Sequence, residues 1–116
     1  MVGAPKKIVG RFYAQLSGRK PVRDWLLDLP RNDRRQIGID IQRVEFGWPL
    51  GMPYCRSLGS SLWEVRSNLA GGRIARVIFC IHEGEMVLLH GFEKKTQKTP
   101  QQDVDLALAR KRELQG

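Results

Sequence analysis

The chain has 116 residues, of which 41% are hydrophobic and 28% charged, which suits one folded core and excludes a disordered or repetitive chain. Twenty Lys and Arg side chains against twelve Asp and Glu give a net charge of +8, which favours a polyanionic partner such as nucleic acid. No apolar run approaches the roughly 20 residues of a membrane span, so no membrane association is expected.

The first half of the chain predicts a strand and a two-helix hairpin. Residues 7–13 are rich in β-branched and aromatic side chains, as in a strand. Pro21 suits the first position of a helix, and Pro30 ends that helix and opens another. Apolar side chains then recur at helical spacing in two stripes, Val22, Trp25, Leu26 and Leu29 and then Ile37, Ile41, Val44 and Trp48. The hairpin is expected over residues 21–47.

The second half predicts three strands and a helix. After a turn-rich connection at residues 51–60, three β-like runs separated by glycine-containing turns predict an antiparallel meander over residues 61–93. The segment Thr99-Pro100-Gln101-Gln102 combines an N-cap residue, a proline at the first helical position and a capping-box glutamine. A C-terminal helix is therefore expected over residues 100–114.

These elements, in the order β-α-α-β-β-β-α, predict a single α+β domain over residues 1–116. Its sheet has about four strands, antiparallel with a mixed edge, and the helix hairpin packs on one face. The large aromatic side chains are interpreted as core and not as platforms for stacking bases; they are Trp25, Trp48, Trp63 and Phe79.

The Glu83-Gly84 turn predicts the register of the last two strands. A two-residue loop there pairs Ile81 with Met86, Phe79 with Leu88, Val77 with His90, Ala75 with Phe92 and Arg73 with Lys94. In this register His82 and His90 lie on opposite faces of the sheet. A pair of imidazoles for acid–base catalysis is therefore not expected.

The N-terminal residues lack the uninterrupted apolar segment of a signal peptide. Cys55 and Cys80 form neither a disulfide framework nor a CxxC pair. These features predict a cytoplasmic protein.

The sequence contains no P-loop, HExxH motif or nucleophile elbow. Glu83, Glu85 and Glu93 fall at turns or strand ends and are interpreted as solvated surface. Neither a metal nor another cofactor is therefore expected.

A cationic cluster near the sheet is the main chemical feature; its members are Arg66, Arg73, Arg76, Lys94, Lys95 and Lys98. Cleavage of RNA without metal requires a deprotonated 2′-OH, a stabilised phosphorane and a protonated 5′-oxygen. Guanidinium and ammonium groups stabilise the phosphorane, and a lysine with a lowered pKa assists proton transfer. The structural alternatives are a strand-edge ion pair for Arg66, solvated loop positions for the lysines and a hydrogen-bonded core position for His90.

Three segments carry a resemblance to a known family, namely residues 62–66, 73–79 and 88–100. They resemble the core of RelE/ParE-superfamily toxins, most closely the phage-derived, HigB-like branch, and the likeness extends over about residues 7–112. The resemblance implies a type II toxin that cleaves mRNA on the translating ribosome. It also implies a helix-turn-helix antitoxin encoded by the adjacent gene, with operator DNA bound only through the antitoxin complex.

The resemblance also implies roles for individual residues. Arg76 matches the arginine that contacts the scissile phosphate, Lys94 and Lys95 match the basic pair at the end of the last strand, and Arg66 matches a phosphate or ribosomal-RNA contact. Arg73 and Lys98 are further candidates for RNA or ribosome binding.

Two departures from the RelE pattern leave the general base open between Lys94 and His90. Glu64 replaces a lysine of that branch, and no tyrosine follows the basic pair. Two alternative functions remain. One is a ParE-type toxin that inhibits DNA gyrase without nuclease chemistry, and the other is an inactive nucleic-acid-binding protein of the same fold.

Overall fold

The computed structural model describes residues 5–94 and 98–115. The helices and strands follow in the order β1 (Val9–Phe12), α1 (Pro21–Asp28), α2 (Arg31–Gly47), β2 (Cys55–Gly59), β3 (Leu62–Asn68), β4 (Ile74–His82), β5 (Glu85–Lys94) and α3 (Gln101–Gln115). A short 3-10 turn at Ala70–Gly72 joins β3 to β4. Among the described residues, no helix is long and apolar enough to cross a membrane.

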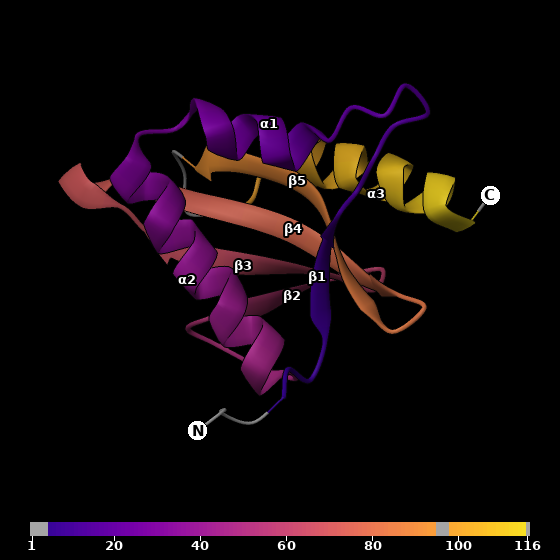
Figure 1. Cartoon of the computed structure of the whole chain (residues 1–116), viewed down its shortest axis with the longest axis horizontal. Coiled ribbons are helices and arrows are strands. Elements are labelled where there is room, and N and C mark those ends of the chain that lie inside the picture. Colours follow the sequence, from indigo (N-terminus) through magenta and orange to yellow (C-terminus); the bar gives the residue numbers. More distant parts are fainter. Residues whose placement is uncertain (1–4, 95–97, 116) are drawn as a thin grey trace.

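The strands form one mixed sheet of five strands in the order β1-β5-β4-β3-β2 (Figure 1). β1 runs parallel to β5, and the other neighbouring strands are antiparallel. The α+β class, the helix hairpin and the C-terminal helix are confirmed. The predicted number of about four strands is wrong, because residues 55–59 form an additional edge strand.

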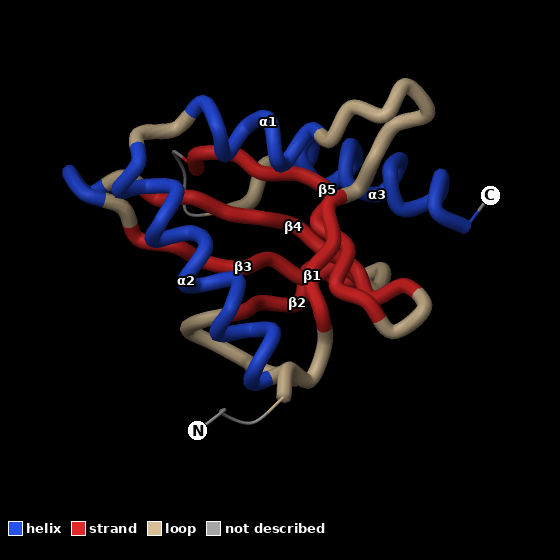
Figure 2. Tube along the Cα trace, in the orientation of Figure 1, coloured by secondary structure: helices blue, strands red, loops and turns tan. Residues whose placement is uncertain are grey.

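Two helical layers cover the sheet, with α1 and α2 on one face and α3 on the other (Figure 2). On the α1–α2 face, Val77 and Phe79 of β4 belong to the larger core cluster. On the α3 face, Ile78 and Cys80 pack with Ala107 in the smaller one. Since both faces of β4 are covered, its sequence is almost continuously apolar.

The extra strand β2 escaped prediction because its sequence looks like a turn. It pairs with β3 through a two-residue turn in which Ser60 and Ser61 have φ values of 54° and 57°. Such positive φ values usually select Asn or Gly, so a Ser-Ser pair gives little signal for a hairpin. The register also shifts between Ser57 and Gly59.

The turn between β4 and β5 agrees with the predicted hairpin. Glu83 and Gly84 have φ values of 50° and 78°, as a two-residue type I′ turn requires. Next to the turn, Ile81 faces Met86 as predicted.

Farther from the turn the predicted register is wrong. Phe79 faces Leu88 as expected, but the adjacent pair is Ile78 with His90, so Leu89 is an extra residue in β5. Such a bulge moves every later side chain of the strand to the other face of the sheet.

The shift changes where the two histidines lie. His90 faces Ile78 and so shares the α3 face with His82, contrary to the prediction. The two positions are still four residues apart along β4, on the order of 13 Å. The conclusion that they form no catalytic pair therefore holds, but for a different reason.

The aromatic side chains form core contacts as predicted. Phe79 is fully buried, and Trp48 packs edge-on against both Phe79 and Trp63. Trp25 of α1 packs over Gly91 of β5, where a Cβ atom would lie 2.4 Å from the indole ring. Gly91 therefore allows α1 to approach the sheet closely.

Candidate functional site

Four cations and one carboxylate gather on the α3 face of the sheet, near the end where β5 finishes. Arg56 of β2 faces Glu64 of β3, and Arg66 of β3 faces Arg76 of β4. Lys94 is the last residue of β5, and the charges of these four side chains all affect its pKa. These five residues are called the cation cluster below. With four positive charges around one negative charge, the cluster favours an anionic ligand.

The centre of the cluster is buried. Glu64 is 0%, Arg76 3% and Lys94 5% exposed. Thr99, in the connection to α3, is also buried, and its hydroxyl donates to Glu64 Oε2 at 2.7 Å. The hydroxyl predicted to cap α3 thus binds the cluster instead, and it ties the start of α3 to β3.

Glu64 and Arg76 approach each other without forming a hydrogen bond. Arg76 Nε lies 3.7 Å from Glu64 Oε1, beyond ordinary hydrogen-bond length. Both atoms are buried and have no hydrogen-bond partner among residues 5–94 and 98–115. Buried polar atoms of this kind are uncommon, and at functional sites they indicate capacity for a ligand.

Burial and mutual repulsion shift the two central cations. Burial lowers the pKa of Arg76, and the nearby charge of Arg66 lowers it further while Glu64 opposes the change. The pKa of Lys94 is lowered first by burial and then by Arg76, against the effect of Glu64. A lysine with a lowered pKa has a larger neutral fraction, and only the neutral amine accepts a proton.

His90, the other candidate for proton transfer, is bonded to α3. Its Nε2 lies 2.6 Å from Asp103 Oδ1 of α3, and its ring stacks on Phe92 with 5.2 Å between centroids. Both partners hold the imidazole between β5 and α3. This arrangement matches the alternative of a hydrogen-bonded core histidine.

Arg73 also lies apart from the cluster with which the sequence grouped it. Its Nη2 donates to Asp33 of α2 at 2.6 Å, and its Nη1 donates to Glu93 at 2.7 Å. β4 begins at Ile74, so Arg73 precedes the strand, and its guanidinium binds a helix of the opposite layer. Arg73 therefore does not lie with Arg66, Arg76 and Lys94, with which the sequence grouped it.

Two lysines of the predicted cluster remain. Lys95 lies outside the described residues. Lys98 is exposed, and with Arg56 and Thr99 it lines a groove of about 320 Å³ between β2 and α3. The predicted site residues Arg66, Arg76, Lys94 and Lys98 thus lie at or beside one site.

Sequence reasoning missed two residues of this site. Arg56 falls in the turn-rich connection over residues 51–60, where the sequence predicts no strand, and the pattern around Thr99 predicts only a helix cap. Glu64 departs from a family pattern, but that departure does not predict its proximity to Arg76. The alternation of Leu62, Glu64 and Arg66 did carry that signal, since these positions share one face of a strand.

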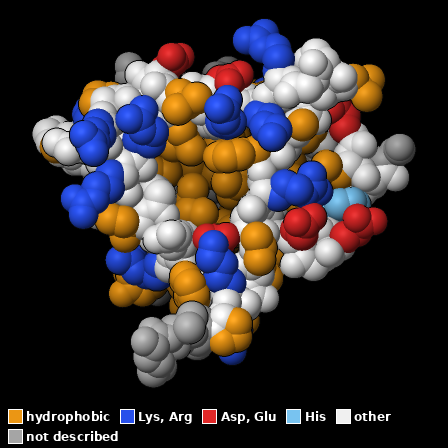
Figure 3. Space-filling model, viewed as in Figure 1, with side chains coloured by type: hydrophobic (Ala, Val, Ile, Leu, Met, Phe, Trp, Pro, Cys, Tyr) orange, Lys and Arg blue, Asp and Glu red, His pale blue; other side chains and the backbone are white. Residues whose placement is uncertain are grey.

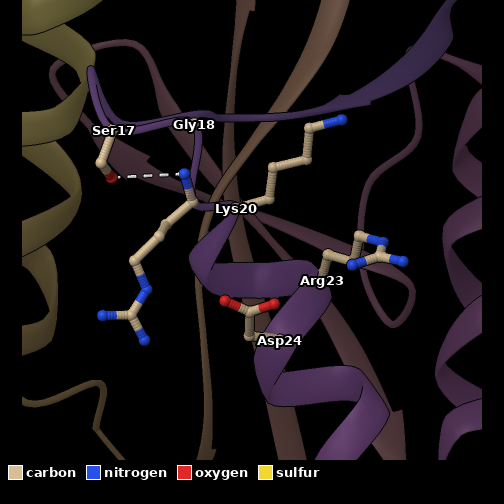
Figure 4. Close-up of a pocket in the computed structure, with 6 residues that line it drawn as sticks. Ser17, Gly18, Lys20, Arg23 and Asp24 are labelled. Carbon is tan, nitrogen blue, oxygen red and sulfur yellow. Dashed lines mark hydrogen bonds between the residues drawn. The ribbon is translucent and has the colours of Figure 1, made fainter.

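Two other hollows lie outside the cation cluster. On the α1–α2 face, hydrophobic side chains fill a hollow surrounded by Lys and Arg (Figure 3). A second hollow, of about 560 Å³, lies at the start of α1, where Lys20 and Arg23 extend away from Asp24 (Figure 4). Among residues 5–94 and 98–115, no group of three or more His, Cys, Asp or Glu side chains could hold a metal ion.

A comparison with known protein families identifies a match. Residues 24–112 match the family model described as "Phage derived protein Gp49-like (DUF891)". The matched range covers more than half of the 116 residues and contains the whole cation cluster and Thr99. No curated protein matches the chain.

Proposed function

The chain belongs to the phage-derived Gp49-like family, which includes RelE-like toxins, and we propose that it is the toxin of a type II toxin–antitoxin system. Its activity is ribosome-dependent, metal-independent cleavage of mRNA. The observation that carries this proposal is the buried cation cluster, in which Arg76 and Lys94 lie beside an incompletely bonded carboxylate.

The first step of the reaction is recognition of the scissile phosphate by Arg76. Its guanidinium is planar and is presented from the central strand of a sheet covered on both faces, which suits bidentate contact with phosphate oxygens. Charge accumulates on those oxygens in the phosphorane transition state, so a fixed cation stabilises the transition state more than the ground state. Arg66 and Arg56 add to this positive field.

Lys94 performs the proton transfer. Its neutral amine takes the proton of the 2′-OH, the 2′-oxygen forms a bond to phosphorus, and the bond from phosphorus to the 5′-oxygen breaks. The leaving 5′-oxygen receives a proton from water. The products are a 2′,3′-cyclic phosphate and a 5′-hydroxyl end, and the lowered pKa of Lys94 makes the neutral amine available.

Glu64 is a positioning residue. It has no exposed surface, so it orients Arg76 and binds Thr99 but does not contact RNA. Its charge also offsets part of the repulsion among the cations, which would otherwise destabilise the fold.

Low exposure of Arg76 and Lys94 supports dependence on the ribosome. Only 3% of Arg76 and 5% of Lys94 is exposed, so the scissile phosphate has to be presented to them in one defined position. A ribosome that holds mRNA in one conformation supplies alignment worth about 7 kcal/mol or more of the barrier. We further propose a helix-turn-helix antitoxin from the adjacent gene as the protein partner, with operator DNA bound only through that complex.

The test is to induce the chain in bacteria and follow protein and DNA synthesis separately. The proposal predicts that protein synthesis stops first and that mRNA acquires new 5′-hydroxyl ends. If DNA synthesis stops first and mRNA stays intact, the toxin is of ParE type and acts on gyrase. The same experiment with Arg76→Ala links any arrest to the cation cluster.

A further inference from the structure

We propose that the groove between β2 and α3 binds one nucleotide of the RNA, next to the phosphate held by the cation cluster. This inference rests on the proposed function and assigns a substrate subsite to it. The groove has a volume of about 320 Å³, at the lower end of the roughly 300 to 1,000 Å³ typical of small-molecule sites. It therefore suits a single nucleotide.

One end of the groove opens on the cluster. Arg56 and Thr99 line the groove, Arg56 faces Glu64 across the strands, and Thr99 donates to the same carboxylate. A nucleotide in the groove would thus lie directly beside the phosphate on Arg76.

Ser60, in the turn between β2 and β3, also lines the groove, and its carbonyl oxygen accepts a hydrogen bond from Lys111 Nζ of α3 at 2.7 Å. Along α3, the lining runs from Gln101 to Leu108, roughly 10 Å of helix. A groove of this length and volume suits one nucleotide.

The groove is lined by apolar side chains and by cations, which match the base and the phosphate of a nucleotide. Leu58, Val104 and Leu108 supply apolar surface on which the flat face of a base can pack. Arg56 and Lys98 supply positive charge for a phosphate, and no Asp or Glu belongs to the described lining.

Gln101 gives the groove a means to discriminate among bases. One N–H of its Nε2 donates to Asp105 Oδ1 at 2.8 Å, which orients the amide and leaves the carbonyl Oε1 and the second N–H for a base edge. A fixed acceptor beside a fixed donor favours a base edge with the complementary arrangement of donor and acceptor. The subsite therefore contributes to the nucleotide preference of cleavage.

Two tryptophan variants provide a matched test. Gln101→Trp fills the mouth of the groove, whereas Gln102→Trp alters an equally exposed neighbour that does not line it. Each variant, checked by thermal melting, is titrated with the four nucleoside 3′-monophosphates. The shifts of the methyl signals of Leu58, Val104 and Leu108 are followed by NMR.

We expect shifts at these methyls in the wild type and in Gln102→Trp, and a roughly tenfold weaker affinity in Gln101→Trp, equal to about 1.4 kcal/mol. Shifts that are absent, located elsewhere or equal in both variants would overturn the subsite. Arg56→Ala, which keeps the groove open, should weaken binding of all four nucleotides alike.

Ribosome-bound cleavage separates this inference from the proposed function. If the wild type and Gln101→Trp cleave mRNA at the same rate with the same nucleotide preference, the subsite is wrong and the nuclease stands. If nucleotides bind in the groove but the wild type cleaves no ribosome-bound mRNA, the subsite stands and the nuclease is wrong.

Discussion

Glu64 and Arg76 lie on neighbouring strands at the centre of the cation cluster, with 3.7 Å between Oε1 and Nε. Neither of these atoms has a hydrogen-bond partner among the described residues. The pair therefore combines electrostatic attraction with unfulfilled hydrogen-bonding capacity. Arg76 Nη1 donates to the carbonyl oxygen of Ala75 at 2.8 Å, which fixes the guanidinium. We interpret this as a site built to hold Arg76 in place while its Nε remains available to a phosphate.

Arg76→Ala should reduce single-turnover cleavage on ribosomes by roughly 100- to 1000-fold, because about 2.7 to 4 kcal/mol of transition-state stabilisation is lost. Arg73→Ala is the control. Its guanidinium already binds Asp33 and Glu93, so this variant should cleave normally although it loses stability. Equal loss of cleavage in the two folded variants would contradict the assignment of Arg76.

Lys94→Ala should reduce the rate severely, but less than Arg76→Ala, and should change its dependence on pH. Because the neutral amine is the active form, the wild-type rate should rise with pH and level off below 10.5, the ordinary pKa of lysine. The variant should lack this inflection. The measurement is single-turnover cleavage across a pH series, and an unchanged profile in Lys94→Ala would show that another group transfers the proton.

Lys94 should also reduce the stability of the fold. Its pKa is lower in the folded than in the unfolded chain, so the unfolded chain binds more protons between the two values and stability rises with pH across that interval. At pH values below that interval, the destabilisation caused by the buried charge of Lys94 is fully present. Lys94→Met should therefore stabilise the protein at neutral pH by roughly 0.5 to 1 kcal/mol. Urea denaturation measures this, and a less stable variant would contradict it.

The Glu64–Arg76 pair should show strong coupling. Glu64→Gln leaves the buried guanidinium without a compensating charge and should cost about 3 kcal/mol of unfolding free energy. In Glu64→Gln combined with Arg76→Met, the unpaired charge is gone, so the double variant should be more stable than Glu64→Gln alone. Additive losses in a denaturation series would mean that the two residues do not interact.

His90→Gln tests the competing candidate for the general base. Since His90 Nε2 is already bonded to Asp103, this change should lower the melting temperature and leave ribosome-bound cleavage within about tenfold of the wild type, a change of 1.4 kcal/mol or less in the barrier. Loss of cleavage comparable to that of Arg76→Ala, in a folded variant, would restore His90 to the reaction.

The sequence predicted the parts of the fold that have strong periodicity. The apolar stripes around Trp25 and Ile41 and the Glu83-Gly84 turn led to the helix hairpin and the central strands. β2 was missed because a short, polar edge strand entered through Ser60 and Ser61 resembles a loop in composition. No local pattern distinguishes the two.

The candidate site was predictable only in part for a related reason. Arg76 and Lys94 lie on strands that the sequence identified, whereas the bulge at Leu89 changes which residues of β5 share their face. The hydrogen bond from Thr99 to Glu64 joins residues 35 positions apart, and a helix-cap interpretation of Thr99 satisfied every local rule. The bulge and this hydrogen bond both depend on tertiary contacts, which local sequence patterns do not predict.

The most direct test of the account is cleavage of one mRNA by the purified protein with and without a translating ribosome. We expect cleavage with a 2′,3′-cyclic phosphate and a 5′-hydroxyl end on the ribosome, none of comparable rate on naked RNA, and loss of the ribosomal reaction in Arg76→Ala. Efficient cleavage of naked RNA would contradict the ribosome dependence. No cleavage in either setting would contradict the nuclease itself.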